Sequence, residues 1–200
     1  MSSPVLWYAT RATGLVAVVL LTATTVLGVL VANRLSTRRW PGFAWQDIHR
    51  GVSLIAMAFL AGHVATSVMD SYVHIGWAAV VVPFASDYRR AWVGLGTIGL
   101  DLLLAVAVTS VLRHRLGART WRAVHWLAYL SWPVGLAHAF GMGTDMHSSW
   151  VIALSIACVA AVVAAALWRL SAGAVRQRRT LVVHGVRHRP LGVPVKHLSA

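Results

Sequence analysis

Two apolar stretches that begin and end with histidine decide the fold: HRGVSLIAMAFLAGH at residues 49–63 and HWLAYLSWPVGLAH at residues 125–138. His49 and His63 are 14 positions apart, and His125 and His138 are 13 positions apart. At a helical rise of about 1.5 Å per residue, each spacing separates its two imidazoles by roughly 20 Å. That distance covers most of a hydrocarbon core of about 30 Å. The sequence therefore predicts two membrane-crossing helices, each with two histidines at different depths.

The composition of the whole chain agrees with a membrane protein. Hydrophobic residues make up 58% of its 200 residues and charged residues only 12%, whereas soluble domains are about a quarter charged. Five apolar segments are long enough to span a bilayer. They are residues 7–31, 48–69, 91–112, 123–140 and 150–168. We expect an all-α, multi-pass protein of the cell membrane, with a bundle of about five transmembrane helices.

A net charge of +13 does not indicate a nucleic-acid partner here, because most cations lie in short loops and a tail beside the apolar segments. The loops after the first and third segments and the C-terminal tail are the arginine-rich ones. This bias predicts an N-terminus outside and a C-terminus in the cytoplasm. The second and fourth segments then run in the same direction. His49 and His125 share the cytoplasmic level, and His63 and His138 share a level nearer the outer face.

Ionisable residues inside a membrane are costly and by default functional. The natural link between two histidines at one level is a haem iron with an imidazole on each side, so we expect haems between the second and fourth helices. Cys158 is the only cysteine, which excludes a CxxCH attachment and leaves b-type haem. On an ideal helix, 14 residues leave His63 about 40° from the face of His49, whereas 13 residues leave His138 about 140° from that of His125. We expect a kink at Pro133 to correct this difference.

Four further residues are candidates for cofactor binding. Arg11 lies within the first segment, where its guanidinium either holds a propionate of the outer haem or reaches the outer headgroups. Arg50 and Arg122 stand beside the inner histidine level with the same two interpretations. Trp132, with Tyr129, lies between the two levels, where it either helps an electron cross or packs as an ordinary aromatic side chain.

Other polar residues leave alternatives open. Asp101 lies in the middle of the third segment, where a structural hydrogen bond is favoured over a pair with Arg11 or a proton relay. Residues 77–84 are expected to form an interfacial or re-entrant piece. His74 and the 145–147 stretch face the same outer side; they are either solvated or gather a metal ion or substrate.

The expected domains are a membrane domain at residues 1–169 and a basic cytoplasmic tail at residues 170–200, too short to fold alone. The tail is expected to lie on anionic lipid or dock a partner. Its histidines are expected to be solvated; they are His184, His188 and His197.

The 14- and 13-residue histidine spacings on two parallel helices resemble the ferric reductase-like transmembrane domain. That family includes NADPH oxidases, ferric-chelate reductases and the haem membrane subunit of the bacterial methionine sulfoxide reductase system. The resemblance covers about residues 7–168 and looks most like the small, stand-alone bacterial members. It implies two stacked b haems, His49/His125 inner and His63/His138 outer, which carry electrons from the cytoplasmic side outward.

The same resemblance implies an oxidoreductase component that needs a separate electron donor. There is no GxGxxG or P-loop motif, so flavin is expected only through a partner. The donor is a separate flavoprotein reductase or membrane quinol, and the acceptor an extracytoplasmic protein or a ferric chelate. One alternative is a quinol-oxidising haem subunit of a separate extracytoplasmic reductase. The other is a haem-free transporter or assembly protein, whose histidines line a polar path or bind another metal.

Overall fold

The computed structural model describes residues 4–33, 41–70, 73, 75–143 and 148–187, with side chains described as far as residue 172. Every regular element in these residues is helical. The elements are α1 (Pro4–Ala32), α2 (Gly42–Met69), α3 (Ala78–Val81), α4 (Arg90–Val111), η1 (Leu112–His114), α5 (Ala118–His125), α6 (Leu127–Met142) and α7 (Ser149–Arg187). The all-α prediction is therefore confirmed for the described part of the chain.

Within the described residues, four helices are long and apolar enough to cross a membrane: α1, α2, α4 with η1, and the Ser149–Ala172 part of α7. The segment predicted at residues 123–140 is not one continuous helix but is divided into α5 and α6. With 16 residues, α6 is about 24 Å long, shorter than the usual transmembrane span. The prediction of about five transmembrane helices is thus corrected to four full-length helices and a shorter, interrupted one.

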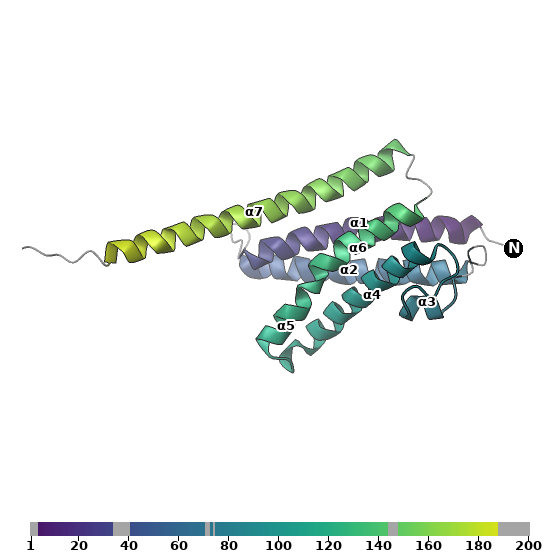
Figure 1. The fold of residues 1–200 in the computed structure, drawn as a ribbon, viewed down its shortest axis with the longest axis horizontal. Coiled ribbons are helices and arrows are strands. Elements are labelled where there is room, and N and C mark those ends of the chain that lie inside the picture. Colours follow the sequence, from purple (N-terminus) through teal and green to yellow (C-terminus); the bar gives the residue numbers. More distant parts are fainter. Residues whose placement is uncertain (1–3, 34–40, 71–72, 74, 144–147, 188–200) are drawn as a thin grey trace, which may run out of the picture.

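The helices form two antiparallel pairs, α1 with α2 and α4 with α6 (Figure 1). The second pair crosses the first at an angle, and the long helix α7 lies along α1. Helix α1 also contacts α6, so it joins the two pairs. By contrast, α2 and α6 make little or no direct backbone contact with each other. The two histidine-bearing helices therefore face each other across a gap rather than packing together.

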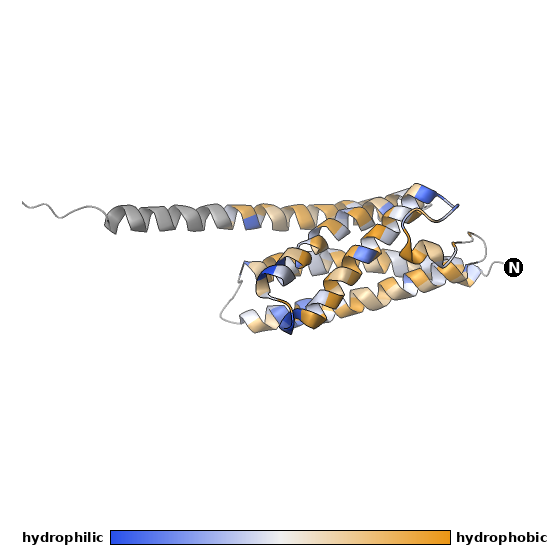
Figure 2. Ribbon diagram, turned by 60° about the horizontal axis from the view of Figure 1, so that its bottom comes forward, coloured by the Kyte–Doolittle hydropathy of each residue, from blue (hydrophilic) through white to orange (hydrophobic). Residues whose placement is uncertain are grey.

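Hydrophobic residues predominate along the helices, as the mostly orange ribbon of Figure 2 shows. Large hydrophobic side chains on several helices are exposed, including Leu54 on α2 at 62% and Ile156 on α7 at 63%. A surface of this kind is unfavourable in water and suits lipid, because the helices satisfy their own backbone hydrogen bonds. The chain is a multi-pass membrane protein.

The break between α5 and α6 lies at Trp126, directly after His125. There the backbone N–H of Tyr129 donates to the Trp126 carbonyl, a bond from i to i−3 in place of the α-helical i−4. Pro133 lies inside α6, and the described backbone is not interrupted there. A change of register between the two histidines therefore lies next to His125, and the kink expected at Pro133 stays a prediction.

The segment predicted at residues 77–84 contains α3, a helix of four residues that packs on α4. The buried hydroxyl of Thr97 donates to the Ala79 carbonyl at 2.6 Å and so ties α3 to α4. Such a bond contributes about 0.5–1.5 kcal/mol net.

Thr97→Val should therefore loosen α3, because the Ala79 carbonyl loses its donor. Hydrogen exchange of the backbone amides at residues 79–82 should speed up several-fold in lipid nanodiscs. Thr109→Val is the matched control, since the Thr109 hydroxyl bonds only carbonyls of its own helix. Equal exchange at residues 79–82 in both variants would show that the Thr97 bond does not hold α3.

Candidate functional site

The four histidines at the ends of the two apolar stretches meet as two pairs across the gap between α2 and the α5–α6 segment. The ring centroids of His49 and His125 are 6.4 Å apart, with their planes at 72°. The ring centroids of His63 and His138 are 6.2 Å apart, with their planes at 79°. The helix α2 supplies one ring of each pair, so the two pairs lie at different depths in the bundle.

These separations fit two imidazoles on opposite sides of one metal ion. A ring nitrogen bonds a metal such as zinc at about 2.0–2.1 Å, and the ring centroid lies about 1.1 Å beyond, which gives about 6.2–6.4 Å across the ion. No group of three or more histidine, cysteine, aspartate or glutamate side chains that could hold a metal occurs among the described residues. Among the described residues each pair would therefore supply two ligands only, which suits a metal whose other positions are filled by a flat macrocycle.

The rings of His63 and His138, the pair predicted to lie at the outer level and called the outer pair in that sense, are oriented by backbone carbonyls; His49 and His125 are likewise called the inner pair. The Nδ1 atom of His63 lies 2.9 Å from the Thr10 carbonyl oxygen, and that of His138 lies 2.7 Å from the Trp92 carbonyl oxygen. When Nδ1–H donates to a carbonyl, the ring is held in the tautomer whose Nε2 carries a free lone pair. Both rings are thereby prepared to bind a metal through Nε2.

The two inner rings are held differently. The Nδ1 atoms of His49 and His125 are buried and have no hydrogen-bond partner among the described residues. The His125 ring instead stacks on Trp121, with centroids 5.0 Å apart and planes at 29°. Stacking on Trp121 therefore helps to orient His125, whereas the His49 ring lies against Gly28 of α1.

Three glycines bring helix backbones against the histidine rings. A Cβ atom added at Gly96 would lie 2.7 Å from His138, one at Gly14 would lie 3.0 Å from His63, and one at Gly28 would lie 3.4 Å from His49. Because α1 runs antiparallel to α2, the 14-residue spacing of Gly14 and Gly28 matches that of His63 and His49. The sequence analysis missed these glycines. The repeated 14-residue spacing is the signal that could have identified Gly14 and Gly28.

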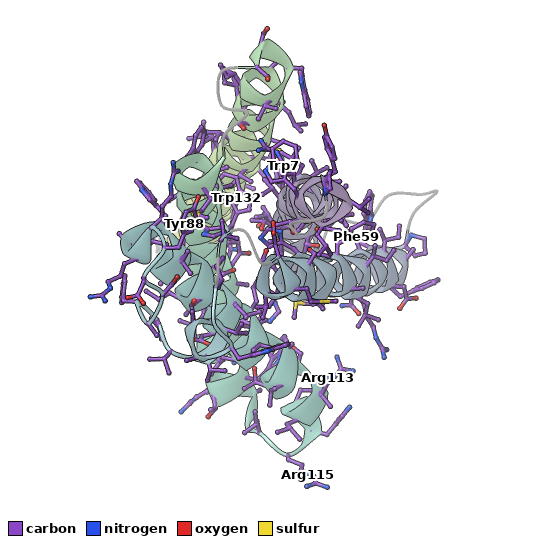
Figure 3. All side chains as sticks on the ribbon, turned by 90° about the vertical axis from the view of Figure 1, so that its right-hand side faces the viewer. Trp7, Phe59, Tyr88, Arg113, Arg115 and Trp132 are labelled. Atoms are coloured by element: carbon purple, nitrogen blue, oxygen red, sulfur yellow. The ribbon has the colours of Figure 1, made fainter. Side chains whose placement is uncertain are left out.

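A cavity of about 360 Å³ lies beside the outer pair. This volume is in the range of small-molecule and cofactor sites. Its wall is mainly apolar and includes His63, His138 and Trp132. Figure 3 looks along the bundle from the end at which α1 begins, and it places Trp132 between α1 and the α4–α6 pair.

The four non-histidine candidates lie in different surroundings. Arg11 lines the cavity, with its guanidinium carbon 4.5 Å from the Trp7 ring centroid. The indole N–H of Trp132 donates to the buried Thr22 hydroxyl at 2.9 Å. Arg50 and Arg122 are exposed near the inner pair, and Arg122 Nε donates to the carbonyl of its own helix four residues earlier.

Arg169 of α7 is a residue whose contact the sequence did not reveal. Its guanidinium lies over the Trp126 ring, 4.9 Å from the centroid, and donates to the Tyr129 hydroxyl at 2.9 Å. Tyr129, expected between the two levels, is therefore engaged with α7. These contacts fasten α7 to the bundle at the break between α5 and α6.

The remaining polar candidates do not join the site. Asp101 is exposed, and no hydrogen bond or ion pair links it to another described residue. The structural hydrogen bond favoured from the sequence and the alternative pair with Arg11 are therefore wrong, and the proton relay is untested. His74 and the 145–147 stretch lie outside the described residues, as do the side chains of the predicted basic tail from residue 173 onward. Helix α7 itself continues past residue 170 to Arg187.

Fold and site together define the class: a multi-pass α-helical membrane protein in which two facing histidine pairs lie between two helical hairpins. Residues 13–136 match the model of a family described as the ferric reductase like transmembrane component, and the chain belongs to that family. The matched range contains His49, His63 and His125 and ends just before His138. The predicted resemblance is confirmed.

Among curated proteins, the chain is similar to the protein-methionine-sulfoxide reductase heme-binding subunit MsrQ of Caulobacter vibrioides. The two are 32% identical over 127 residues, which is 62% of this chain and 56% of the relative. The chain thus matches little more than half the length of that protein. No solved structure matches.

The glycine contacts predict a graded effect of alanine substitution. In an open helix position, Gly→Ala stabilises by about 0.5–1 kcal/mol. Gly96→Ala should instead lower the thermal unfolding temperature in detergent, because its methyl group displaces the His138 ring. Gly14→Ala should have a smaller effect and Gly28→Ala the smallest, following the contact distances.

Gly51→Ala is the matched control for this series, since a Cβ atom there meets nothing within 4 Å. Its unfolding temperature should be unchanged or higher. A Gly96→Ala protein as stable as the Gly51→Ala protein would contradict the close approach of α4 to His138.

Proposed function

We propose that this chain is a transmembrane electron conduit that holds two b-type haems, one between His49 and His125 and one between His63 and His138. The observation that carries the proposal is the pair of centroid separations, 6.4 and 6.2 Å, each of which fits an imidazole on either side of one metal ion. A bound haem supplies reversible one-electron exchange between ferric and ferrous iron. The protein's task is to fix the ligands, exclude water and hold the two sites at set depths.

The family and the relative support haem in preference to another cofactor. The matched relative is named as a heme-binding subunit, and the chain belongs to the ferric reductase like family. Each site here has two histidines and no third protein ligand among the described residues, which disfavours a bare metal ion. A haem-free transporter with polar histidines would have no reason for both pairs to adopt the same separation.

Each candidate residue has a role in this proposal. The carbonyls of Thr10 and Trp92 keep His63 and His138 in the tautomer that ligates through Nε2. Arg11, beside the outer cavity, is placed to hold a propionate, because a guanidinium pairs with a carboxylate.

At the inner level, Arg50 and Arg122 are the corresponding cations. Trp132 lines the cavity beside the outer pair. In this proposal its ring helps an electron cross between the outer and inner haems. No side chain in this set needs to gain or lose a proton.

The charge distribution supports a direction for the electrons. Arginine-rich connections place the N-terminus outside, so the His49/His125 level faces the cytoplasm. Electrons then enter there, from a separate flavoprotein reductase or from membrane quinol, and leave from the His63/His138 level. Because the relative is a subunit of a methionine-sulfoxide reductase, an extracytoplasmic reductase is the favoured acceptor, and a ferric chelate is the other. Residues 1–169 form the haem domain, and residues 170–200 are a basic tail that contacts lipid or a partner.

A second candidate function keeps the haems and changes the donor. In that case the chain oxidises quinol at the bilayer and passes electrons to the extracytoplasmic reductase. The observation that favours it is that the sequence has no GxGxxG or P-loop motif, so the electrons come from a donor outside this sequence, and quinol is a donor already present in the bilayer. Reduction of the purified protein by menaquinol, compared with reduction by a flavin reductase and NADH, distinguishes the two donors.

The haem count tests the proposal itself. Protein purified from cells with ample haem should contain two b-type haems per chain, measured as the pyridine haemochrome against protein mass. His63→Ala should retain only the inner haem and His49→Ala only the outer one, so each should bind about one haem per chain. His114→Ala, an exposed histidine on η1, is the control and should keep both.

Two results would overturn the proposal. One is colourless wild-type protein that is folded by its helical content, which would favour the haem-free class. The other is complete loss of haem from His63→Ala and His49→Ala alike while both variants remain folded, which would contradict two separate sites.

A further inference from the structure

Asp101 is the one polar side chain of the α4 centre that the site does not explain. It is the twelfth of the 22 residues of α4, and its side chain is exposed on the outer surface of the bundle. No hydrogen bond or ion pair joins it to any other described residue. An ionisable group at the centre of a membrane helix is costly unless it finds a partner, and such groups normally face the protein interior.

Asp101 heads a stripe of exposed residues. Leu104, Val108 and Val111 follow it at steps of three, four and three residues and are 44%, 54% and 79% exposed. This is the a/d pattern of a helix that packs on another helix, with a single polar residue at an a position. We name these four residues the α4 stripe.

The internal contacts of α4 use a different part of the helix. The buried residues of α4 are Val93, Gly94, Thr97 and Gly99, which lie in its N-terminal half. Thr97 holds α3, and Gly96 lies against His138, so this half is engaged with its own chain. Helix α4 also contacts α5, and Leu100 and Leu103 line the cavity, so the α4 stripe lies on the face of the helix that these contacts leave exposed.

We propose that the α4 stripe is the contact surface for a second copy of this chain, with the two Asp101 carboxyl groups hydrogen-bonded to each other. Copies inserted by the same route have the same orientation, so their α4 helices run parallel and place Asp101 opposite Asp101. A protonated carboxyl group both donates and accepts a hydrogen bond, and this makes it complementary to its own symmetry mate. Polar side chains join transmembrane helices in this way, and two-fold symmetric dimers are the commonest assemblies.

Self-complementarity favours a second copy over a different partner. A different partner helix would need both a polar group opposite Asp101 and its own apolar seam opposite Leu104, Val108 and Val111, whereas a second copy supplies both with the same residues. In a parallel pair of identical helices, the same three residues meet their own counterparts and form the apolar seam on one side of the carboxyl pair.

Cross-linking of the purified full chain in defined lipid vesicles tests the proposal without reference to haem. The native cysteine is first removed by Cys158→Ser, and single cysteines are introduced by Leu104→Cys, Val108→Cys or Leu54→Cys. Leu54 on α2 is 62% exposed and is the matched control for a lipid-facing position. Mild oxidation should give dimers from the first two proteins and only monomers from the third.

The carboxyl pair is tested by the dissociation constant of the dimer, measured by fluorescence energy transfer at increasing lipid-to-protein ratio. Asp101→Leu should weaken the dimer roughly 3- to 30-fold, the range for interhelical hydrogen bonds in membranes. Asp101→Asn, whose amide also donates and accepts, should restore most of the affinity. Helical content and thermal unfolding of each variant establish that it is folded.

Three results would overturn the proposal. Wild-type protein that stays monomeric at all lipid ratios is the first. Equal cross-linking from Leu54→Cys is the second. The third is unchanged or tighter association of folded Asp101→Leu, or association that occurs only after a membrane protein with a cationic helix is added.

Discussion

The close approach of helix backbones to the histidine rings is the constraint on which the rest of this structure depends. In lipid there is little hydrophobic force between helices, so their association relies on tight packing at small residues. Gly14 and Gly28 let α1 lie against α2, and Gly96 lets α4 lie against α6. The rings of His63, His49 and His138 occupy the space that side chains at these glycines would fill. The same contacts therefore determine both how closely the helices of each pair pack and how the histidine rings are oriented.

The gap between α2 and α6 follows from this arrangement. Each of these helices packs on its own hairpin partner, and the two make little direct contact. Helix α1 contacts α6 beside this gap, and the two histidine pairs face each other across it. The rings of His63 and His138 lie by carbonyl acceptors and border a cavity, whereas in the other pair His125 stacks on Trp121. The two pairs therefore have different surroundings, which would give the two proposed haems different potentials.

Much of the fold could be predicted from the sequence because a bilayer imposes length and polarity on every spanning segment. The segment predicted at residues 48–69 matches most of α2, and the one at 91–112 matches α4. The meeting of His49 with His125 and of His63 with His138 follows from helix direction, since parallel helices with nearly equal spacings bring equal depths together. These features follow from the length, direction and residue spacing of regular helices, and all three can be derived from the sequence.

The parts that could not be predicted depend on contacts between segments. The break at Trp126 lies beside contacts of Trp126 and Tyr129 with Arg169 on α7, about 40 residues further along the chain, and no local pattern reports them. The kink was predicted at Pro133 because a proline has a local signal, whereas nothing in the sequence around Trp126 marks the break there. Asp101 was expected to pair inside the bundle, but it is exposed. Which face of α4 is buried depends on the helices that pack on it, and the sequence of α4 alone does not give these. The spacing of Gly14 and Gly28 was visible, yet its meaning required knowing that α1 packs on α2 with these glycines against the histidine rings.

The central claim is that each histidine pair holds one iron between two imidazoles whose planes are nearly perpendicular, at 72° and 79°. Electron paramagnetic resonance of the oxidised protein at low temperature measures this directly, because crossed imidazole planes give ferric haem a highly anisotropic low-spin signal. The account predicts two such signals of equal intensity, which together account for all the haem. A high-spin signal, a rhombic spectrum typical of parallel ligand planes, or a signal from a single haem per chain would contradict it.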